Sequence, residues 1–128
     1  MVATLQTDAA TDAVVAEAAV AAYVARGNRV LDIPLIEMVH VSVSADVATV
    51  RSIVAVEDRV VELVVDDGPF EALGPAMWAL AARGWDVVAL TPSGRNGEAH
   101  RALRGTPCRI QPWWVEGREV RFGRLETP

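Results

Sequence analysis

The chain has 128 residues, of which 52% are hydrophobic, and a formal net charge of -5. This length is typical of one domain with one core. The acidic balance argues against nucleic acid as the partner, because domains that bind nucleic acid usually carry a basic surface. No apolar run approaches the ~20 residues that span a bilayer. The first residues also lack the basic and apolar regions of a secretory signal, so we expect a cytoplasmic protein.

Residue types suited to metal or covalent chemistry are scarce. Cys108 is the single cysteine, which excludes an internal disulfide. His40 and His100 are the two histidines and stand far apart in the sequence, so we expect no metal site and no cofactor. Ser93 lacks the G-x-S-x-G pattern of a catalytic serine, and we predict no catalytic residue.

The first half of the chain predicts a helix followed by strands. Residues 1–7 are small and polar and are expected to be disordered. Residues 8–26 are rich in alanine and repeat apolar side chains at helical spacing. Residues 39–43, 47–56 and 60–65 are dense in valine and predict three strands of an antiparallel meander. The stretch 47–56 also fits a helical period, but its β-branched residues favour a strand.

Helical and strand patterns alternate in the second half. Residues 70–83 repeat apolar side chains at helical spacing, 85–90 predict a short buried strand, and 97–104 fit a short second helix. Residues 108–115 and 118–125 predict a final hairpin around a glycine. Strands separated by helices of this length are expected to pair in parallel through right-handed crossovers.

These patterns predict a single α/β domain over residues 8–128. The domain would have two or three layers and one mixed sheet, in which an N-terminal antiparallel meander is followed by a βαβαβ unit and a C-terminal hairpin. The helices over 8–26 and 70–83 would pack on this sheet.

A ligand site is predicted at the carboxyl edge of the parallel strands, where open α/β sheets bind their ligands. The turn after residue 90 opens a helix, and free N–H groups together with an arginine favour phosphate or another small anion there. In a purely structural interpretation, the arginine pairs with a neighbouring aspartate and the glycines only shape the turn. The candidate ligand-binding residues are Asp66, Asp67, Ser93, Gly94, Arg95 and Gly97.

The stretch 60–90 resembles the opening of a response-regulator receiver domain, in which an acidic pair ends the first strand and binds magnesium. The resemblance implies that role for Asp66 and Asp67. A receiver also needs a later aspartate as phosphate acceptor and then a lysine. No aspartate follows Asp86 and the chain has no lysine, so receiver activity is excluded. The same stretch is similar to a phosphoribosyltransferase loop, but residues 68–71 replace its Thr/Gly-rich turn, which argues against that activity as well.

An interaction surface is predicted on the last hairpin. Neighbouring residues of a strand face opposite sides, so only one of Trp113 and Trp114 can be core, and we expect Trp114 to point outward. Tryptophan and arginine are the residues enriched in binding hot spots. Arginines flank the pair at Arg109, Arg118 and Arg121.

Two functions are consistent with these features. The first is a non-enzymatic protein-interaction, accessory or regulatory module, which binds a protein partner or a second copy of itself. The alternative is a small-anion or phosphate site at the carboxyl edge of the strands. We favour the first, because complete catalytic constellations are missing.

Overall fold

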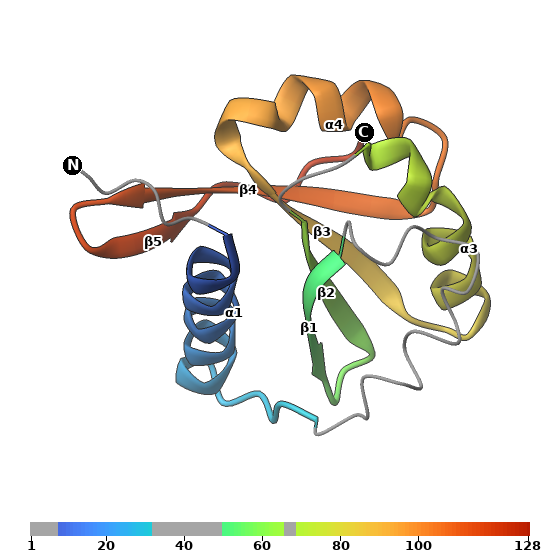
Figure 1. The fold of residues 1–128 in the computed structure, drawn as a ribbon. Coiled ribbons are helices and arrows are strands. Elements are labelled where there is room, and N and C mark those ends of the chain that lie inside the picture. Colours follow the sequence, from blue (N-terminus) through green and yellow to red (C-terminus); the bar gives the residue numbers. More distant parts are fainter. Residues whose placement is uncertain (1–7, 32–49, 66–68) are drawn as a thin grey trace.

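The computed structural model describes residues 8–31, 50–65 and 69–128. The expected disordered segment 1–7 and the expected strand 39–43 lie outside the described residues, as do Asp66 and Asp67. The mixed α/β fold predicted from the sequence is confirmed (Figure 1). Its helical elements are α1 (Asp8–Ala25), η3 (Phe70–Leu73), α3 (Gly74–Ala82), η4 (Ser93–Arg95) and α4 (Asn96–Ala102). Its strands are β1 (Val50–Val56), β2 (Val60–Val65), β3 (Asp86–Pro92), β4 (Cys108–Glu116) and β5 (Glu119–Phe122).

The five described strands form one sheet in the order β1-β2-β3-β4-β5. The β2–β3 and β3–β4 pairs are parallel, whereas β1–β2 and β4–β5 are antiparallel. Val50–Val56 is therefore a strand, which decides between the two interpretations of that stretch. Of the expected meander, only its last two strands fall in the described part of the chain.

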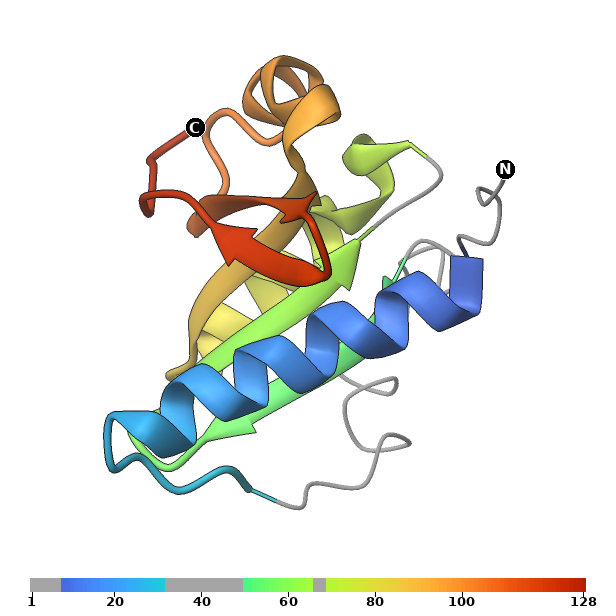
Figure 2. The same cartoon turned by 90° about the vertical axis from the view of Figure 1, so that its left-hand side faces the viewer.

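Helices cover both faces of the sheet, so the described residues make three layers (Figures 1 and 2). One face packs against η3, α3 and α4 through a cluster that includes Leu63, Ala89 and Ile110. The other face packs against α1 through Val64, Val88 and Leu90. Because side chains alternate along a strand, β2 and β3 have apolar residues at almost every position, as expected for strands buried on both faces.

Several elements differ from the sequence expectation. The strand expected over 118–125 is shorter, because β5 covers only Glu119–Phe122. The single helix expected over 70–83 is a 3-10 turn followed by an α-helix, with Pro75 in the first turn of α3. A proline has no N–H and clashes with the preceding turn, so it is accommodated at a helix start and not in a helix interior. The strand expected over 85–90 continues to Pro92 as β3, since Thr91 and Pro92 still align with Pro112 and Trp113 of β4.

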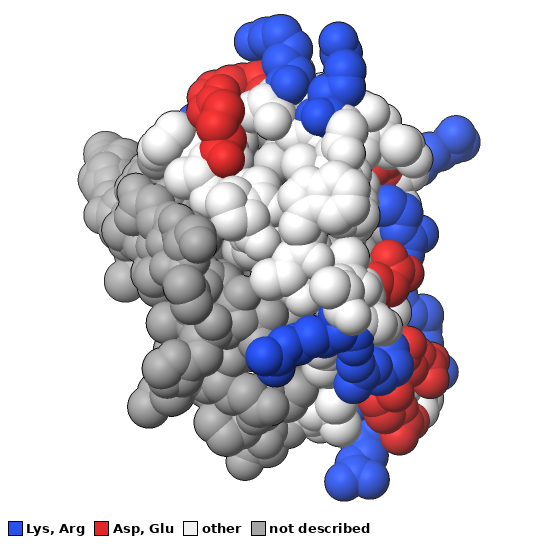
Figure 3. Space-filling model, turned by 90° about the vertical axis from the view of Figure 1, so that its right-hand side faces the viewer, with Lys and Arg blue, Asp and Glu red and all other residues white. Residues whose placement is uncertain are grey.

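The side of the molecule that carries α3 has uncharged residues at its centre and arginine and acidic side chains toward its margins (Figure 3). Trp78, on α3, has 58% of its surface exposed and is the most exposed tryptophan. None of the helices in the described part of the chain is both long enough and apolar enough to cross a membrane.

Candidate functional site

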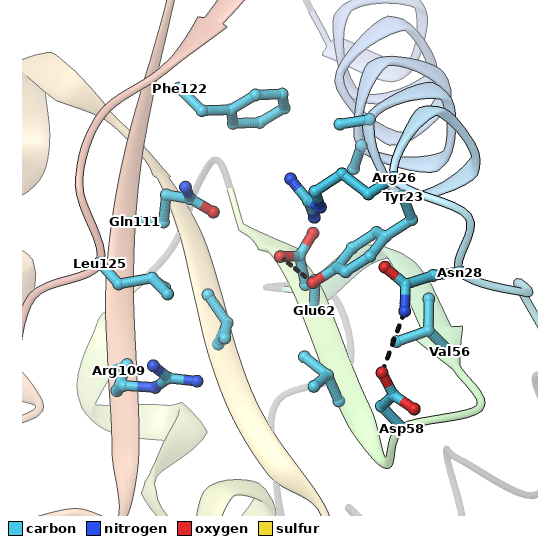
Figure 4. Close-up of a pocket in the computed structure, with 14 residues that line it drawn as sticks. Tyr23, Arg26, Asn28, Val56, Asp58, Glu62, Arg109, Gln111, Phe122 and Leu125 are labelled. Atoms are coloured by element: carbon cyan, nitrogen blue, oxygen red, sulfur yellow. Dashed lines mark hydrogen bonds between the residues drawn. The ribbon is translucent and has the colours of Figure 1, made fainter.

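A cavity of about 370 Å³ opens on the sheet face that carries α1. Helix α1 packs mainly on β1 and β2 and also reaches β5 (Figure 2). The cavity lies beside the helix, where Val88 of β3 and Arg109 of β4 line it. A volume of this size lies within the range of ordinary small-molecule sites. The residues around it come from α1 and the turn after it, from the sheet and its β1–β2 turn, and from the chain after β5. Ten of them are labelled in Figure 4. They are Ala19, Ala22, Tyr23, Arg26, Asn28, Val56, Asp58, Val60, Glu62, Val88, Arg109, Gln111, Phe122 and Leu125.

A buried carboxyl group, that of Glu62, lies at the floor of this cavity (Figure 4). Only 5% of the residue's surface is exposed. The hydroxyl of Tyr23 donates a hydrogen bond of 2.8 Å to its Oε2 atom. Burial raises the pKa of Glu62, and the Tyr23 hydrogen bond and the nearby Arg26 only partly oppose this shift. Burial and the facing carboxylate also raise the pKa of Tyr23, so its phenol keeps its proton.

The local sequence positions both partners of this hydrogen bond. Glu62 stands opposite Val88 in β3, and because side chains alternate along β2 it shares the α1 side of the sheet with Val64. Tyr23 lies in the last turns of α1. That helix ends where Gly27 adopts a φ of 86°, and Asn28 donates its N–H to the Tyr23 carbonyl over 3.0 Å. This C-terminal motif ends the helix, and the chain after it joins the sheet through a bridge between Val30 and Val56.

Two arginines enter the cavity from different elements. Arg26, the first residue after α1, lies over the Tyr23 ring with its guanidinium carbon 4.7 Å from the ring centre. Arg109, on β4, pairs with Asp86 at the start of β3. Figure 4 shows Arg26 above the Glu62 carboxylate and Arg109 on the opposite wall. The cavity therefore combines one buried acid with cationic groups on both sides of it.

Amides and one further acid complete the polar lining. Asn28 donates to Asp58 over 3.0 Å at the mouth of the cavity. Gln111 donates its Nε2 to the Gly123 carbonyl over 2.9 Å, which leaves its amide oxygen as an acceptor. The described lining residues include no serine, cysteine or histidine. The arrangement is thus suited to binding a polar molecule, and its described residues do not form a serine–histidine or cysteine–histidine pair.

The predicted carboxyl-edge site is only partly described. Ser93 and Gly94 are exposed in η4, and Gly97 lies in the first turn of α4. Arg95 donates to both carboxylate oxygens of Glu98, over 3.2 and 2.6 Å, and lies 4.2 Å from the Phe70 ring centre. The structure thus records a local ion pair for this arginine. The cavity lies at the opposite, amino-terminal end of the parallel strands.

The predicted interaction residues separate into two places. Arg109 lines the cavity, whereas Arg118 and Arg121 are exposed on the hairpin. Arg121 pairs with Glu119 at 2.9 Å and with Glu116 at 3.3 Å. Trp113 is 7% exposed and packs in the core under α1, whereas Trp114 is 38% exposed. The outward orientation expected for Trp114 is therefore correct.

Sequence reasoning missed Glu62 and Tyr23. One signal was available, since Glu62 is the single charged residue in an otherwise apolar strand. A charged residue is rarely fully buried unless it is paired. Tyr23 is the only tyrosine of the chain, but its place in an alanine-rich helix does not reveal which residue it faces.

Comparisons of the chain with models of protein families, with curated proteins and with solved structures found no match. Within the described ranges, no group of three or more histidine, cysteine, aspartate or glutamate side chains is placed to hold a metal ion.

Proposed function

We propose that this chain is a binding protein for a small polar organic molecule, held in the cavity between α1 and the sheet. One observation carries the proposal: the cavity has a buried carboxyl group at its floor, and among the described residues only Tyr23 donates a hydrogen bond to it. A buried acid with a raised pKa inside a cavity is a common sign of a functional site. Binding is favoured over catalysis because the described lining residues include no serine, cysteine or histidine, and the raised pKa of Tyr23 keeps its phenol protonated.

A thermal-shift screen with small organic acids, amines and amino acids tests this proposal. Ala22 lines the cavity, so Ala22→Phe should fill it, while Ala25→Phe adds the same side chain to an exposed position of the same helix outside the cavity. At least one compound should raise the Tm of the wild type and of Ala25→Phe, and leave the Tm of Ala22→Phe unchanged. A screen without any stabilising compound, or one whose shifts persist in Ala22→Phe, would overturn the proposal.

Self-association through the last hairpin is a second candidate function. The hairpin of β4 and β5 extends beyond the body of the molecule, and Trp114 and the neighbouring Val115 are 38% and 54% exposed on it (Figure 1). Strand β5 is also the last of the described strands in the sheet, and an edge of this kind can pair with a second copy of the chain. Sedimentation equilibrium should show a dimer that weakens by about tenfold or more in Trp114→Ala. A monomer at all concentrations would exclude this candidate.

A further inference from the structure

The floor of the cavity offers hydrogen-bond acceptors. Tyr23 donates to Oε2 of Glu62, and no described residue donates to Oε1. The Gln111 amide oxygen lies on the neighbouring strand β4 and faces the cavity (Figure 4). A buried carboxylate is costly without a full set of donors. The free oxygen therefore favours a ligand group that brings its own protons, and an ammonium group supplies three of them.

The rim of the cavity offers donors. The described contact of Arg26 is the face of the Tyr23 ring, and a contact of this kind leaves the guanidinium N–H groups available. Arg109 uses part of its guanidinium on Asp86, which lies outside the cavity lining. Arginine is well suited to a planar carboxylate, because its paired N–H groups match the two oxygens.

Apart from Asn28 and Asp58 at the mouth, the rest of the wall is apolar. Side chains of β1, β2, β3 and the C-terminal segment line it without a hydrogen-bonding group. These side chains are Val56, Val60, Val88, Phe122 and Leu125. They provide room for a hydrocarbon or aromatic part between the two polar ends of a ligand.

We infer that the ligand is an apolar amino acid or a close analogue, with its ammonium group on Glu62, its carboxylate on Arg26 or Arg109, and its side chain on the apolar wall. This inference rests on the proposed function and deepens it. The ammonium group and the carboxylate of the ligand would each lie beside a side chain of opposite charge. The cavity should therefore bind molecules with both groups more tightly than molecules with one of them.

Calorimetric titration with three matched probes tests the inference. Phenylalanine carries both charged groups, 3-phenylpropionate lacks the ammonium group, and phenethylamine lacks the carboxylate. Phenylalanine should bind about tenfold tighter than either of the others, because each charge-assisted contact contributes at least that factor. If 3-phenylpropionate or phenethylamine binds as tightly as phenylalanine, the inference is wrong, whereas the proposed function still stands. If phenylalanine does not bind, the amino acid class is wrong, and the screen with Ala22→Phe decides on the proposed function separately.

Two variants test which side chains bind the ammonium group and the carboxylate of phenylalanine. Glu62→Gln keeps the acceptor for Tyr23 and removes the charge, so phenylalanine should fall to the affinity of 3-phenylpropionate, whose own affinity should not decrease. The double variant Arg26→Gln/Arg109→Gln should reduce phenylalanine to the affinity of phenethylamine. Arg118→Gln, on the exposed hairpin, is the control and should leave all three affinities unchanged. Glu62→Gln should be compared only if its Tm equals or exceeds that of the wild type. If it then loses affinity for all three probes alike, Glu62 does not bind the ammonium group specifically.

Discussion

Glu62 and Tyr23 form a hydrogen bond that joins α1 to the sheet across 39 positions of the chain. Tyr23→Phe removes the donor and leaves a buried carboxylate without it, so the free energy of unfolding should fall by about 1–3 kcal/mol at neutral pH. Urea denaturation measures this loss. The same substitution in a Glu62→Gln background should cost less, because a neutral amide tolerates the loss of the donor better. Equal costs in the two backgrounds would show that the charge of Glu62 plays no part.

The raised pKa of Glu62 predicts a pH dependence of stability with a definite sign. As the pH rises above the ordinary value of 4.5, the unfolded chain loses this proton before the folded chain does. Stability should therefore fall as the pH rises, until the pH passes the folded-state pKa of Glu62. Hydrogen bonds from Asn96 and His100 lower the pKa of Glu126. Its effect on stability therefore occurs below pH 4.5 and has the opposite sign, because there stability rises with pH.

Glu62→Gln isolates this effect. Urea denaturation at intervals between about pH 5 and about pH 8 should give a smaller decrease of stability for the variant than for the wild type. At the upper end the variant should be the more stable of the two, because it no longer buries an ionised carboxylate. Parallel curves for both proteins would contradict the burial effect that we assign to Glu62.

At the scale of the element, strand β4 shows how alternation distributes two adjacent tryptophans. Trp113 packs with Leu90 in the core under α1, so Trp113→Ala should cost about 3–5 kcal/mol. Trp114→Ala removes a side chain that is 38% exposed and should cost clearly less. Thermal and urea denaturation of both variants check the difference. Equal losses would mean that the hairpin packs differently from the arrangement described.

Gly123 lies at a close approach on the same hairpin. A Cβ atom at this position would stand 2.8 Å from Cγ of Pro112 and 3.4 Å from Cζ3 of Trp114. Gly123→Ala should therefore destabilise the domain by about 1–3 kcal/mol, since the proline ring cannot move aside easily. At Gly94, where nothing lies within 4 Å of an added Cβ, the same substitution should change stability little. Equal effects at both glycines, measured by urea denaturation, would argue against the close packing of Gly123 on Pro112.

At the scale of the whole molecule, local pattern was enough to predict a mixed α/β fold. The alanine-rich period of α1 and the valine-rich strands β2 and β3 are properties of short stretches that local rules describe. The break between η3 and α3 is local too, because it follows from Pro75.

The cavity could not be predicted in this way. It depends on where α1 crosses the sheet, and the sequence records only that α1 has a wide apolar surface of small side chains. General experience with open α/β sheets places a ligand at the carboxyl ends of the strands. In this chain the cavity lies at their amino-terminal ends, because α1 leaves the face over Val88 and Arg109 uncovered there. Glu62 is part of the site only because its strand faces the end of α1.

The most direct test of the cavity as the ligand site is an NMR titration of the labelled protein with phenylalanine. The amide signals of Tyr23, Glu62 and Gln111 should shift, and intermolecular contacts should connect the ligand ring to methyl groups of Val60 and Val88. In Ala22→Phe the same titration should leave these signals unmoved, while Ala25→Phe should behave as the wild type. If the shifts are confined to Gly94 and Gly97 at the carboxyl edge, or persist unchanged in Ala22→Phe, the cavity between α1 and the sheet is not the binding site.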